Sequence, residues 1–365
     1  MNLEQREKYS RQIIFPAIGE AGQERLLGSS AVLVGCGALG TVTANLLVRA
    51  GIGRLRIVDR DFVEMSNLQR QALFEEADAR ASLPKAAAAE RRLRAINSDA
   101  EVEGIVSDLT PANIEELISG FPLILDGTDN FETRLLMNDA AISLGIPWIY
   151  GAAVGSYGVT MTIRPGETTC LACLLEVNAG SDGESNGGAT KMAAGETCDT
   201  SGVLSSATSV IASIQATEAI KFLSGNAQAM NPRLISCDVW TGRFQSIRVE
   251  RNPRCRACAR RDFTYLTGDA QPHITLCGRD SVQIHERCRT IDLVELGKRL
   301  RAIFAADERN NEGHEARDNV RGNEFLLRFS VPPYEITVFA DGRALVKGTQ
   351  DPAVARSLYA RFIGS

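Results

Sequence analysis

A glycine-rich loop near the start of the chain has the residue types and spacing of a phosphate site. Gly35, Gly37 and Gly40 stand in the run GCGALG, which follows an apolar segment typical of a buried strand and precedes one with helical period. Glycines here let the backbone turn sharply and approach a phosphate, and the N-terminus of the following helix favours negative charge. Asp59, 19 residues beyond Gly40, ends the next predicted strand, where a carboxylate can accept hydrogen bonds from ribose hydroxyls. We predict a nucleotide site, with close helix–strand packing as the alternative reason for the glycines.

Polar residues after this loop distinguish between two kinds of nucleotide chemistry. Arg70 and Lys85 are suited to neutralising a triphosphate and its leaving pyrophosphate, and Asp129 is suited to holding Mg²⁺. Hydride transfer with a nicotinamide cofactor needs none of these groups. Each residue alone also has a structural explanation, as a solvated lysine, an ion-paired arginine or a helix cap. Their combination favours a reaction of ATP.

Four cysteines form the second pattern with a chemical meaning. Cys170 and Cys173 form one CxxC pair, Cys255 and Cys258 form another, and 81 residues separate the two pairs. Two such pairs are typical of a tetrahedral structural zinc site, which has four thiolate ligands and no open position for a substrate. A redox CxxC motif or unrelated buried thiols are the alternatives.

Histidine is absent from most of the chain, which limits the chemistry available there. The three histidines all lie in the last quarter, so the first 272 residues contain no imidazole base and no Ser-His-Asp triad. Cys198 lies in a glycine-rich segment, residues 178–200, that we expect to be a long mobile loop. A cysteine there could reach an activated carbonyl or carry a persulfide, or it could be idle.

The composition excludes several classes of protein. Of the 365 residues, 44% are apolar and 23% are charged, which argues against a disordered or fibrous chain. The net charge of −5 gives no general attraction to nucleic acid or anionic lipid, so we expect neither as a partner. The N-terminus lacks a secretory pattern, and the most apolar stretch, residues 31–48, suits a strand, turn and helix better than a membrane span. Nine cysteines then indicate a reducing compartment, and we expect a cytoplasmic protein.

Strands and helices are expected to alternate through the first two thirds of the chain. Predicted strands cover residues 31–36, 54–59, 101–106 and 122–126, and predicted helices cover 38–51, 85–97, 112–119, 131–144 and 203–223. This alternation predicts a mostly parallel sheet with right-handed crossovers, which is a Rossmann-like α/β fold. We expect this domain to span residues 1–268 and to include paired strands at 234–250.

A smaller α+β domain is expected over residues 269–365. Apolar runs predict strands at 273–285, 324–331, 334–339 and 344–347 and helices at 291–304 and 351–362, with a polar linker at 307–322. Asp341-Gly342 between two apolar runs is a strong hairpin signal, and Asp351-Pro352 is a typical helix start. The composition of this domain indicates no particular chemistry.

At these motifs the chain resembles the ThiF/MoeB/HesA adenylyltransferases, which are bacterial relatives of the ubiquitin-activating enzymes. The resemblance covers roughly residues 5–265, in the segments YSRQI at 9–13, GCGALG at 35–40, VDRDFVEMSNLQRQ at 58–71, PK at 84–85, DGTDN at 126–130, both CxxC pairs and TSGVLSS at 200–206. The C-terminal domain resembles an appendage of some thiamine-type members and does not resemble the rhodanese domain of others. Any sulfur donor would then be a separate protein.

The resemblance implies a reaction with a carrier protein. In this family a small ubiquitin-fold carrier ends in Gly-Gly, and its terminal carboxylate attacks the α-phosphate of ATP to give an acyl-adenylate and pyrophosphate. This step would prepare the carrier for sulfur transfer in thiamine, molybdopterin or tRNA-thiolation pathways. A carboxylate is already ionised at neutral pH, so the attack needs no histidine base. Catalysis would come from positioning and from neutralising phosphate charge.

The resemblance also implies roles for individual residues. Gly37 and Asp59 would hold the adenosine side of ATP, and Asp129 the magnesium. The residues implied near the phosphates are Asp61, Asn67, Arg70 and Lys85, and Gln71 belongs to the same ATP-binding set. Arg11 matches an arginine that reaches into the partner subunit's site, which implies a homodimer with shared active sites.

Cys198 matches the position at which some thiamine-type members carry a cysteine that bonds to the carrier during sulfur transfer, whereas molybdopterin-type members do not need one. Three alternative functions stay open. Cys198 could form a thioester with a ubiquitin-like modifier, the chain could be a non-catalytic nucleotide-binding scaffold, or it could be a nicotinamide oxidoreductase. The combination of Arg11, Arg70, Lys85 and Asp129 favours an enzyme over a scaffold. Failure to bind NADH would exclude the oxidoreductase.

Overall fold

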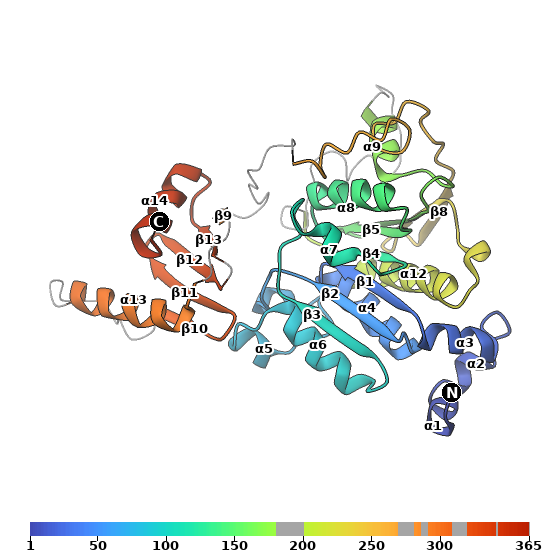
Figure 1. Cartoon of the computed structure of the whole chain (residues 1–365), viewed down its shortest axis with the longest axis horizontal. Helices are drawn as coiled ribbons and strands as arrows, with labels where there is room; N and C mark the ends of the chain where they lie inside the picture. The colour runs from blue at the N-terminus through green and yellow to red at the C-terminus, as the bar shows by residue number, and fades with distance from the viewer. Residues whose placement is uncertain (180–200, 269–280, 286–290, 309–319, 341, 365) are drawn as a thin grey trace. The chain divides into compact units, whose positions relative to one another are not determined.

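A computed structural model describes two separate units of the chain (Figure 1). The described residues are 1–179, 201–268, 281–285, 291–308, 320–340 and 342–364. Contacts between residues divide the chain into a first unit, residues 1–80 with 84–271, and a second, residues 81–83 with 272–365.

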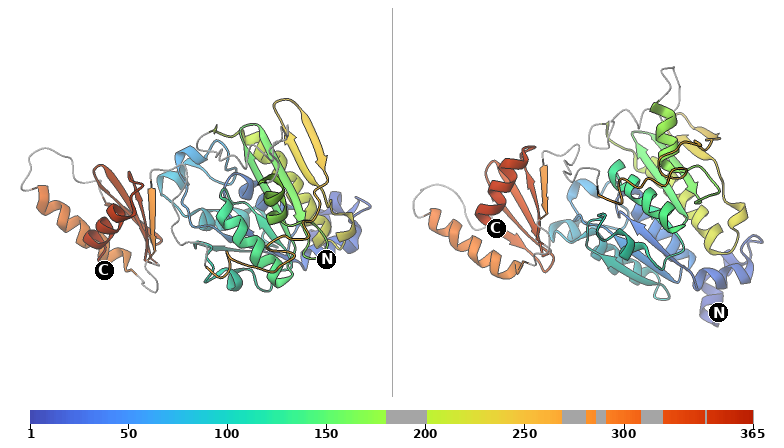
Figure 2. Two further views of the ribbon diagram at one scale, coloured as in Figure 1. Left: turned by 90° about the horizontal axis from the view of Figure 1, so that it is seen from above. Right: turned by 45° about the horizontal axis from the view of Figure 1, so that its top comes forward.

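The first unit contains an eight-stranded sheet with the order β3-β2-β1-β4-β5-β6-β7-β8. Its strands are β1 (Ser30–Val34), β2 (Arg54–Val58), β3 (Glu101–Ile105), β4 (Ile124–Asp126), β5 (Trp148–Val154), β6 (Tyr157–Ile163), β7 (Leu234–Asp238) and β8 (Arg243–Ile247). The first five pair in parallel, and β6, β7 and β8 continue the sheet as antiparallel strands, with β8 at the edge (Figure 2). The parallel half confirms the predicted Rossmann-like α/β fold.

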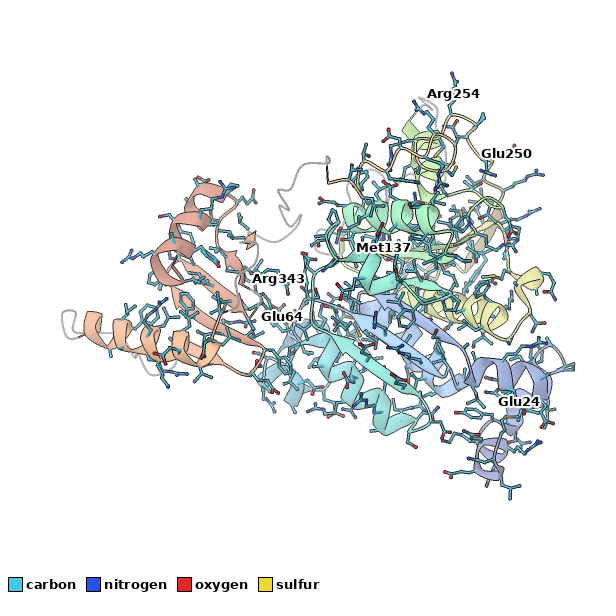
Figure 3. The ribbon with its side chains drawn as sticks, in the orientation of Figure 1. Glu24, Glu64, Met137, Glu250, Arg254 and Arg343 are labelled. Atoms are coloured by element: carbon cyan, nitrogen blue, oxygen red, sulfur yellow. The ribbon has the colours of Figure 1, made fainter. Side chains whose placement is uncertain are left out.

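Successive residues of the central strand point to opposite faces of this sheet, and helices cover both faces. Val32 and Val34 of β1 belong to a core that also includes residues of α7 (Ile114–Ile118) and α8 (Phe131–Leu144), Met137 among them (Figure 3). Leu33 instead faces Gly40, at the start of α4. The helices that pack with α4 (Ala38–Ala50) are α6 (Lys85–Ile96) and α12 (Ser205–Leu223).

Several short helices lie outside the predicted pattern. They are α1 (Leu3–Lys8), α2 (Ser10–Ile13), α3 (Gly19–Leu27), α5 (Glu76–Arg80) and α9 (Leu171–Ala179). Helix α9 includes residues 178 and 179, so these two do not begin a loop as we expected, and residues 180–200 lie outside the described residues. Among the described helices, none combines the length and the apolar character that crossing a membrane requires.

In the part of the chain that the structure describes, the second unit is a small antiparallel sheet with two helices, and its strand order is β10-β11-β12-β13-β9. Its strands are β9 (Ser281–His285), β10 (Val320–Gly322), β11 (Leu326–Val331), β12 (Tyr334–Phe339) and β13 (Arg343–Lys347), and its helices are α13 (Leu293–Glu308) and α14 (Pro352–Phe362). Leu300, Phe329 and Tyr359 belong to one core that joins sheet and helices. The Asp351 side chain accepts from the Ala353 N–H at 2.8 Å, which confirms the predicted helix start.

One expectation for this unit differs from the structure, and two others fall partly outside the described residues. The predicted linker 307–322 contains the last residues of α13 and all of β10, which pairs with β11. The predicted strand at 273–285 is described only from residue 281 onward, and Asp341 of the predicted hairpin turn lies outside the described residues.

Candidate functional site

The glycine loop joins β1 to α4 and packs directly against the chain that follows β4. Gly35 has a φ of +87°, and its N–H donates to the Val58 carbonyl at 2.8 Å. A Cβ added at Gly35 would stand 2.6 Å from the Gly127 carbonyl carbon, and one added at Gly40 would stand 2.1 Å from the Gly35 oxygen. Both distances are far below a normal contact. Close packing of the backbone therefore explains Gly35 and Gly40 without a ligand.

Gly37 differs from these two glycines because a side chain at this position would make only ordinary contacts. It caps the N-terminus of α4, and a Cβ at this position would meet nothing nearer than 3.8 Å. The nearest side-chain atom is Nε2 of the buried Gln71, 3.9 Å from that point. The Oε1 atom of Gln71 is buried and has no hydrogen-bond partner among the described residues. Gly37 is thus the loop glycine that packing does not require, and it caps a helix N-terminus, a place that favours negative charge.

Asp59 ties the glycine loop to the end of β2. One carboxylate oxygen accepts from the Cys36 N–H at 2.6 Å, and the other accepts from the Asp61 N–H at 2.7 Å. Burial raises the pKa of Asp59, while the positive charge of Lys85 opposes that rise. Each carboxylate oxygen has a second lone pair. The predicted ribose ligand thus has a structural role in the loop and keeps acceptor capacity.

Lys85 brings a buried positive charge to the same edge of the sheet. It is the first residue of α6 and 5% exposed, and its Nζ lies 3.0 Å from Oδ2 of Asp61. Burial alone would lower the pKa of Lys85, but the carboxylates of Asp61 and Asp59 raise it above its ordinary value. The lysine is therefore charged at neutral pH. Arg60, which pairs with Asp108 at 2.9 Å, adds a cation that the sequence patterns did not single out.

The segment 64–71 is ordered by its own hydrogen bonds. The buried Asn67 accepts from the Glu64 N–H at 3.0 Å, and Arg70 donates to the Ser66 carbonyl at 2.8 Å. Asn67 therefore shapes the turn through its side-chain oxygen. Arg70 is half-buried and directly precedes Gln71 in the sequence.

The turn after β4 carries Asp129 and depends on Asp126, which opens the DGTDN motif, and on Arg134, which no motif singled out. Asp129 is exposed. Burial alone would lower the pKa values of Arg60, Lys85 and Arg134, but nearer carboxylates and the charge of Asp129 raise them above their ordinary values. Asp126 and Arg134 form a buried ion pair at 3.0 Å beneath this turn. Asp126 is the last residue of β4, and its place in the DGTDN motif was the signal for it in the sequence.

The loops after β1, β2 and β4 meet at one edge of the sheet. The Gly127 N–H donates to the Val34 carbonyl at 2.7 Å, while Gly35 and Cys36 bond to the end of β2. The chain order reverses between β1 and β4, and open α/β sheets bind ligands at such a point, outside the carboxyl ends of the strands. The structure thus brings together the glycine loop, Asp59, Asp61, Gln71 and Lys85.

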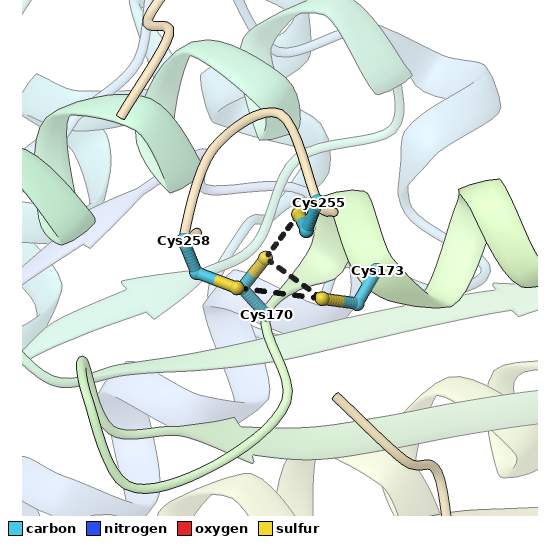
Figure 4. A group of neighbouring side chains, drawn as sticks. All are labelled: Cys170, Cys173, Cys255 and Cys258. Atoms are coloured by element: carbon cyan, nitrogen blue, oxygen red, sulfur yellow. Dashed lines mark hydrogen bonds between the residues drawn. The ribbon is translucent and has the colours of Figure 1, made fainter. Parts of the chain in front are cut away.

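The four cysteines form a separate cluster whose geometry suits a metal (Figure 4). Cys170 Sγ lies 3.7 Å from Cys173 and 3.6 Å from Cys255, and the Cys173 and Cys258 sulfurs are 3.4 Å apart. A tetrahedron with zinc–sulfur bonds of about 2.3 Å has edges of roughly 3.8 Å, close to these distances. The Cys170 thiol lowers the pKa of Cys173 by hydrogen bonding, whereas the hydrogen bond to Cys173 and burial raise the pKa of Cys170, and burial raises that of Cys258. The cluster could bind zinc.

The remaining predicted residues lie elsewhere. Arg11 is exposed on α2, which packs against α1 and α3, so it lies outside the group of loops described above. Cys198 lies outside the described residues. Cys36 and Cys237 are buried, and burial raises the pKa of each thiol, which fits a structural role.

The fold and these loops define a nucleotide-binding α/β protein with a separate four-cysteine cluster. A model of the ThiF family matches residues 9–257, and the chain belongs to this family, which confirms the resemblance. It is 44% identical to a sulfur carrier protein ThiS adenylyltransferase of Bacillus subtilis, with 98% of this chain and 99% of the relative covered. It is 35% identical to a SAMP-activating enzyme E1 of Haloferax volcanii, with 70% of this chain and 89% of the relative covered.

Solved structures support the fold. A structure of E. coli MccB with ATP matches with a TM-score of 0.58 and 23% identity, over 69% of this chain and 74% of that chain. At this identity the match shows the arrangement of the sheet and helices, and it carries no statement about substrates.

Proposed function

We propose that this chain is an ATP-dependent adenylyltransferase that activates the C-terminal Gly-Gly carboxylate of a small ubiquitin-fold sulfur-carrier protein. The observation that carries the proposal is the pairing of Gly37, a loop glycine at the N-terminus of α4 that close packing does not require, with the buried cation Lys85 at the same sheet edge. A helix N-terminus and a buried lysine favour a polyphosphate. The near full-length similarity to a ThiS adenylyltransferase supports this choice of reaction.

The proposed reaction transfers AMP to the carrier. A carboxylate oxygen of the carrier attacks the α-phosphorus of ATP, a new P–O bond forms, and the bond to the bridging oxygen of pyrophosphate breaks. No proton transfer is needed, because the attacking carboxylate is already ionised. Lys85 and Arg70 would neutralise phosphate charge, Gly37 would admit the phosphates, and Asp59 would accept from the ribose.

Magnesium fits the residues present. Mg²⁺ is usually held by one or two carboxylates together with substrate phosphates, and the exposed Asp129 is such a carboxylate beside three cations. When bound, the ion would neutralise charge on the phosphates. We likewise propose structural zinc at Cys170, Cys173, Cys255 and Cys258, since the donor set is all sulfur and the distances suit a tetrahedron.

We further propose a homodimer in which Arg11 contributes to the site of the partner subunit. The exposed side chains of Arg11, Ile14 and Phe15 near α2 support this, because an N-terminal apolar surface of this kind suits a subunit interface. A cytoplasmic location, a separate sulfur donor and a domain boundary near residue 268 complete the proposal.

Carrier-dependent ATP–pyrophosphate exchange tests the proposal. Purified protein is mixed with Mg²⁺, ATP, labelled pyrophosphate and a panel of Gly-Gly-ending carriers, and each carrier is also tested with its last glycine removed. Exchange that needs the intact terminus is the expected result, and Asp129→Ala should abolish it. ATP binding without exchange for any carrier would favour the scaffold.

A second function has one observation in its favour, the 35% identity to a protein named as an E1 enzyme. In that case Cys198 would form a thioester with a ubiquitin-like modifier. The two functions differ in their product. A thiocarboxylate on the carrier supports sulfur transfer, whereas a thioester that passes to a lysine amine supports conjugation.

A further inference from the structure

A buried ion pair fills the space between the ends of β4 and β5. The two strands pair only at Ile124 with Trp148 and at Leu125 with Ile149. Beyond these pairs, side chains replace the backbone ladder. Oδ2 of Asp126 accepts from the Gly151 N–H at 3.3 Å, and Nη2 of Arg134 donates to the Gly151 carbonyl at 3.0 Å.

The same pair holds the turn that follows β4. Oδ1 of Asp126 accepts from the Thr128 N–H at 2.9 Å and from its hydroxyl at 2.7 Å, and Arg134 donates to the Thr128 carbonyl. The peptide group is planar, so fixing the Thr128 carbonyl also fixes the plane that leads into Asp129. On the other side, the Asn130 side chain accepts from the Thr133 N–H at 2.8 Å and caps α8. Asp129 therefore lies between the fixed Thr128 carbonyl and the residue that caps α8.

Arg134 occupies a position that is unfavourable for a positive charge. It lies in the first turn of α8, where the helix dipole disfavours positive charge, and it is 4% exposed. A buried ion pair often contributes no net stability relative to apolar residues of similar size. The hydrogen bonds to the Thr128 and Gly151 carbonyls give the arginine a positioning task that a lysine or an apolar residue cannot perform in full.

We propose that Arg134 is a positioning residue that, through Asp126 and the Thr128 carbonyl, holds Asp129 in the direction needed to bind the magnesium of MgATP. The inference rests on the proposed function, in which Asp129 is the magnesium ligand. Arg134 itself touches neither ATP nor the carrier. If the Asp126–Arg134 pair were purely structural, replacing Arg134 would change only the stability of the protein. If Arg134 is a positioning residue, its replacement also changes the Mg²⁺ dependence of ATP binding.

The test compares Arg134→Lys with the wild type and with a matched control, Arg56→Lys. Arg56 is a half-buried arginine of the same sheet that bonds to Glu103 at 2.9 Å and to the Leu117 carbonyl at 2.9 Å, away from the turn. ATP binding is measured by calorimetry across a series of Mg²⁺ concentrations without any carrier. Pyrophosphate exchange is measured with saturating carrier, and thermal unfolding is recorded for each protein.

We expect Arg134→Lys to raise the Mg²⁺ concentration for half-maximal ATP binding and exchange about tenfold, as loss of an outer-sphere support typically does. Arg56→Lys should lower the melting temperature without moving this concentration. Thr128→Val, which removes one hydrogen bond to Asp126, should move it in the same direction by about fivefold. This second variant decides the question if Arg134→Lys does not fold.

An unchanged Mg²⁺ dependence in Arg134→Lys or Thr128→Val, with only a lower melting temperature, would overturn the inference. These measurements distinguish failure of the proposed function from failure of the inference about Arg134. A wild-type protein that binds MgATP but shows no exchange with any carrier contradicts the proposed reaction, and the calorimetric shift still tests the role of Arg134.

Discussion

Asp139 of α8 and Arg256 of the second CxxC motif form a two-point ion pair. Nη1 of Arg256 lies 2.8 Å from one Asp139 oxygen, and Nη2 lies 3.1 Å from the other. The neighbouring Asn138 accepts from the Leu171 N–H at 3.0 Å, directly after Cys170. Asn138 therefore holds the first CxxC motif and Asp139 holds the second, and these two residues are neighbours on α8. The start of the same helix follows Asp129, so the cysteine cluster and the candidate site share a rigid support.

Zinc removal is expected to destabilise the first unit. The protein should contain about one zinc per chain by elemental analysis, because four thiolates complete a tetrahedral site. Asp139→Asn should weaken zinc retention about tenfold, since it loosens the support of the second motif. Competition with a chromogenic chelator measures this. A metal-free protein with an unchanged melting temperature would contradict the zinc site.

Lys85→Met should abolish pyrophosphate exchange and destabilise the protein. It leaves the carboxylates of Asp61 and Asp59 without their buried cation, and loss of one partner of a buried pair costs about 3–5 kcal/mol in the free energy of unfolding. Denaturant titration measures the loss. The double variant Asp61→Asn with Lys85→Met should regain part of the stability but no exchange. Exchange in the single variant would show that Lys85 does not neutralise phosphate.

Cys198→Ser should leave adenylation intact. The acyl-adenylate forms before any thiol can react, so the exchange rate should stay within about twofold of the wild type. The same assay measures this, and a mass spectrum of the carrier after addition of a sulfur donor shows whether the later step is lost. Loss of exchange in a folded Cys198→Ser protein would contradict the order of steps.

Acid should weaken the contact between β2 and β3. Burial alone would raise the pKa of Glu103, but hydrogen bonds and charge from Arg56 and Arg54 outweigh it and lower the pKa below the ordinary value of 4.5. A carboxyl whose pKa is lower in the folded state contributes stability above its unfolded pKa, and this contribution is lost as the pH falls through the folded value. Glu103→Gln should therefore flatten the fall in melting temperature below pH 4.5, measured by thermal unfolding across pH. Equal slopes in both proteins would refute this.

Local patterns predicted the elements that carry the site. Helix α8 begins and ends at residues 131 and 144, as expected, because the Asn130 cap and Gly145, which has a positive φ, mark its ends in the sequence. The N-terminal helices were not predicted, since they depend on distant partners. The buried Tyr9, for example, accepts from Asn97 at 2.8 Å. Strands β5 and β6 were also not predicted, because the two apolar segments follow each other with only a short turn at Gly155 between them.

The sequence by itself determined which chemistry is available to this protein. Residue type and spacing along one segment suffice to indicate a phosphate loop at Gly37 or a pair of cysteine ligands, because those features are local. Only the tertiary structure decided that close packing requires Gly35 and Gly40 but not Gly37, and that Arg134 reaches the turn before Asp129. These relationships depend on how closely segments distant in the chain approach one another, and that approach is set by packing of the whole sheet and its helices.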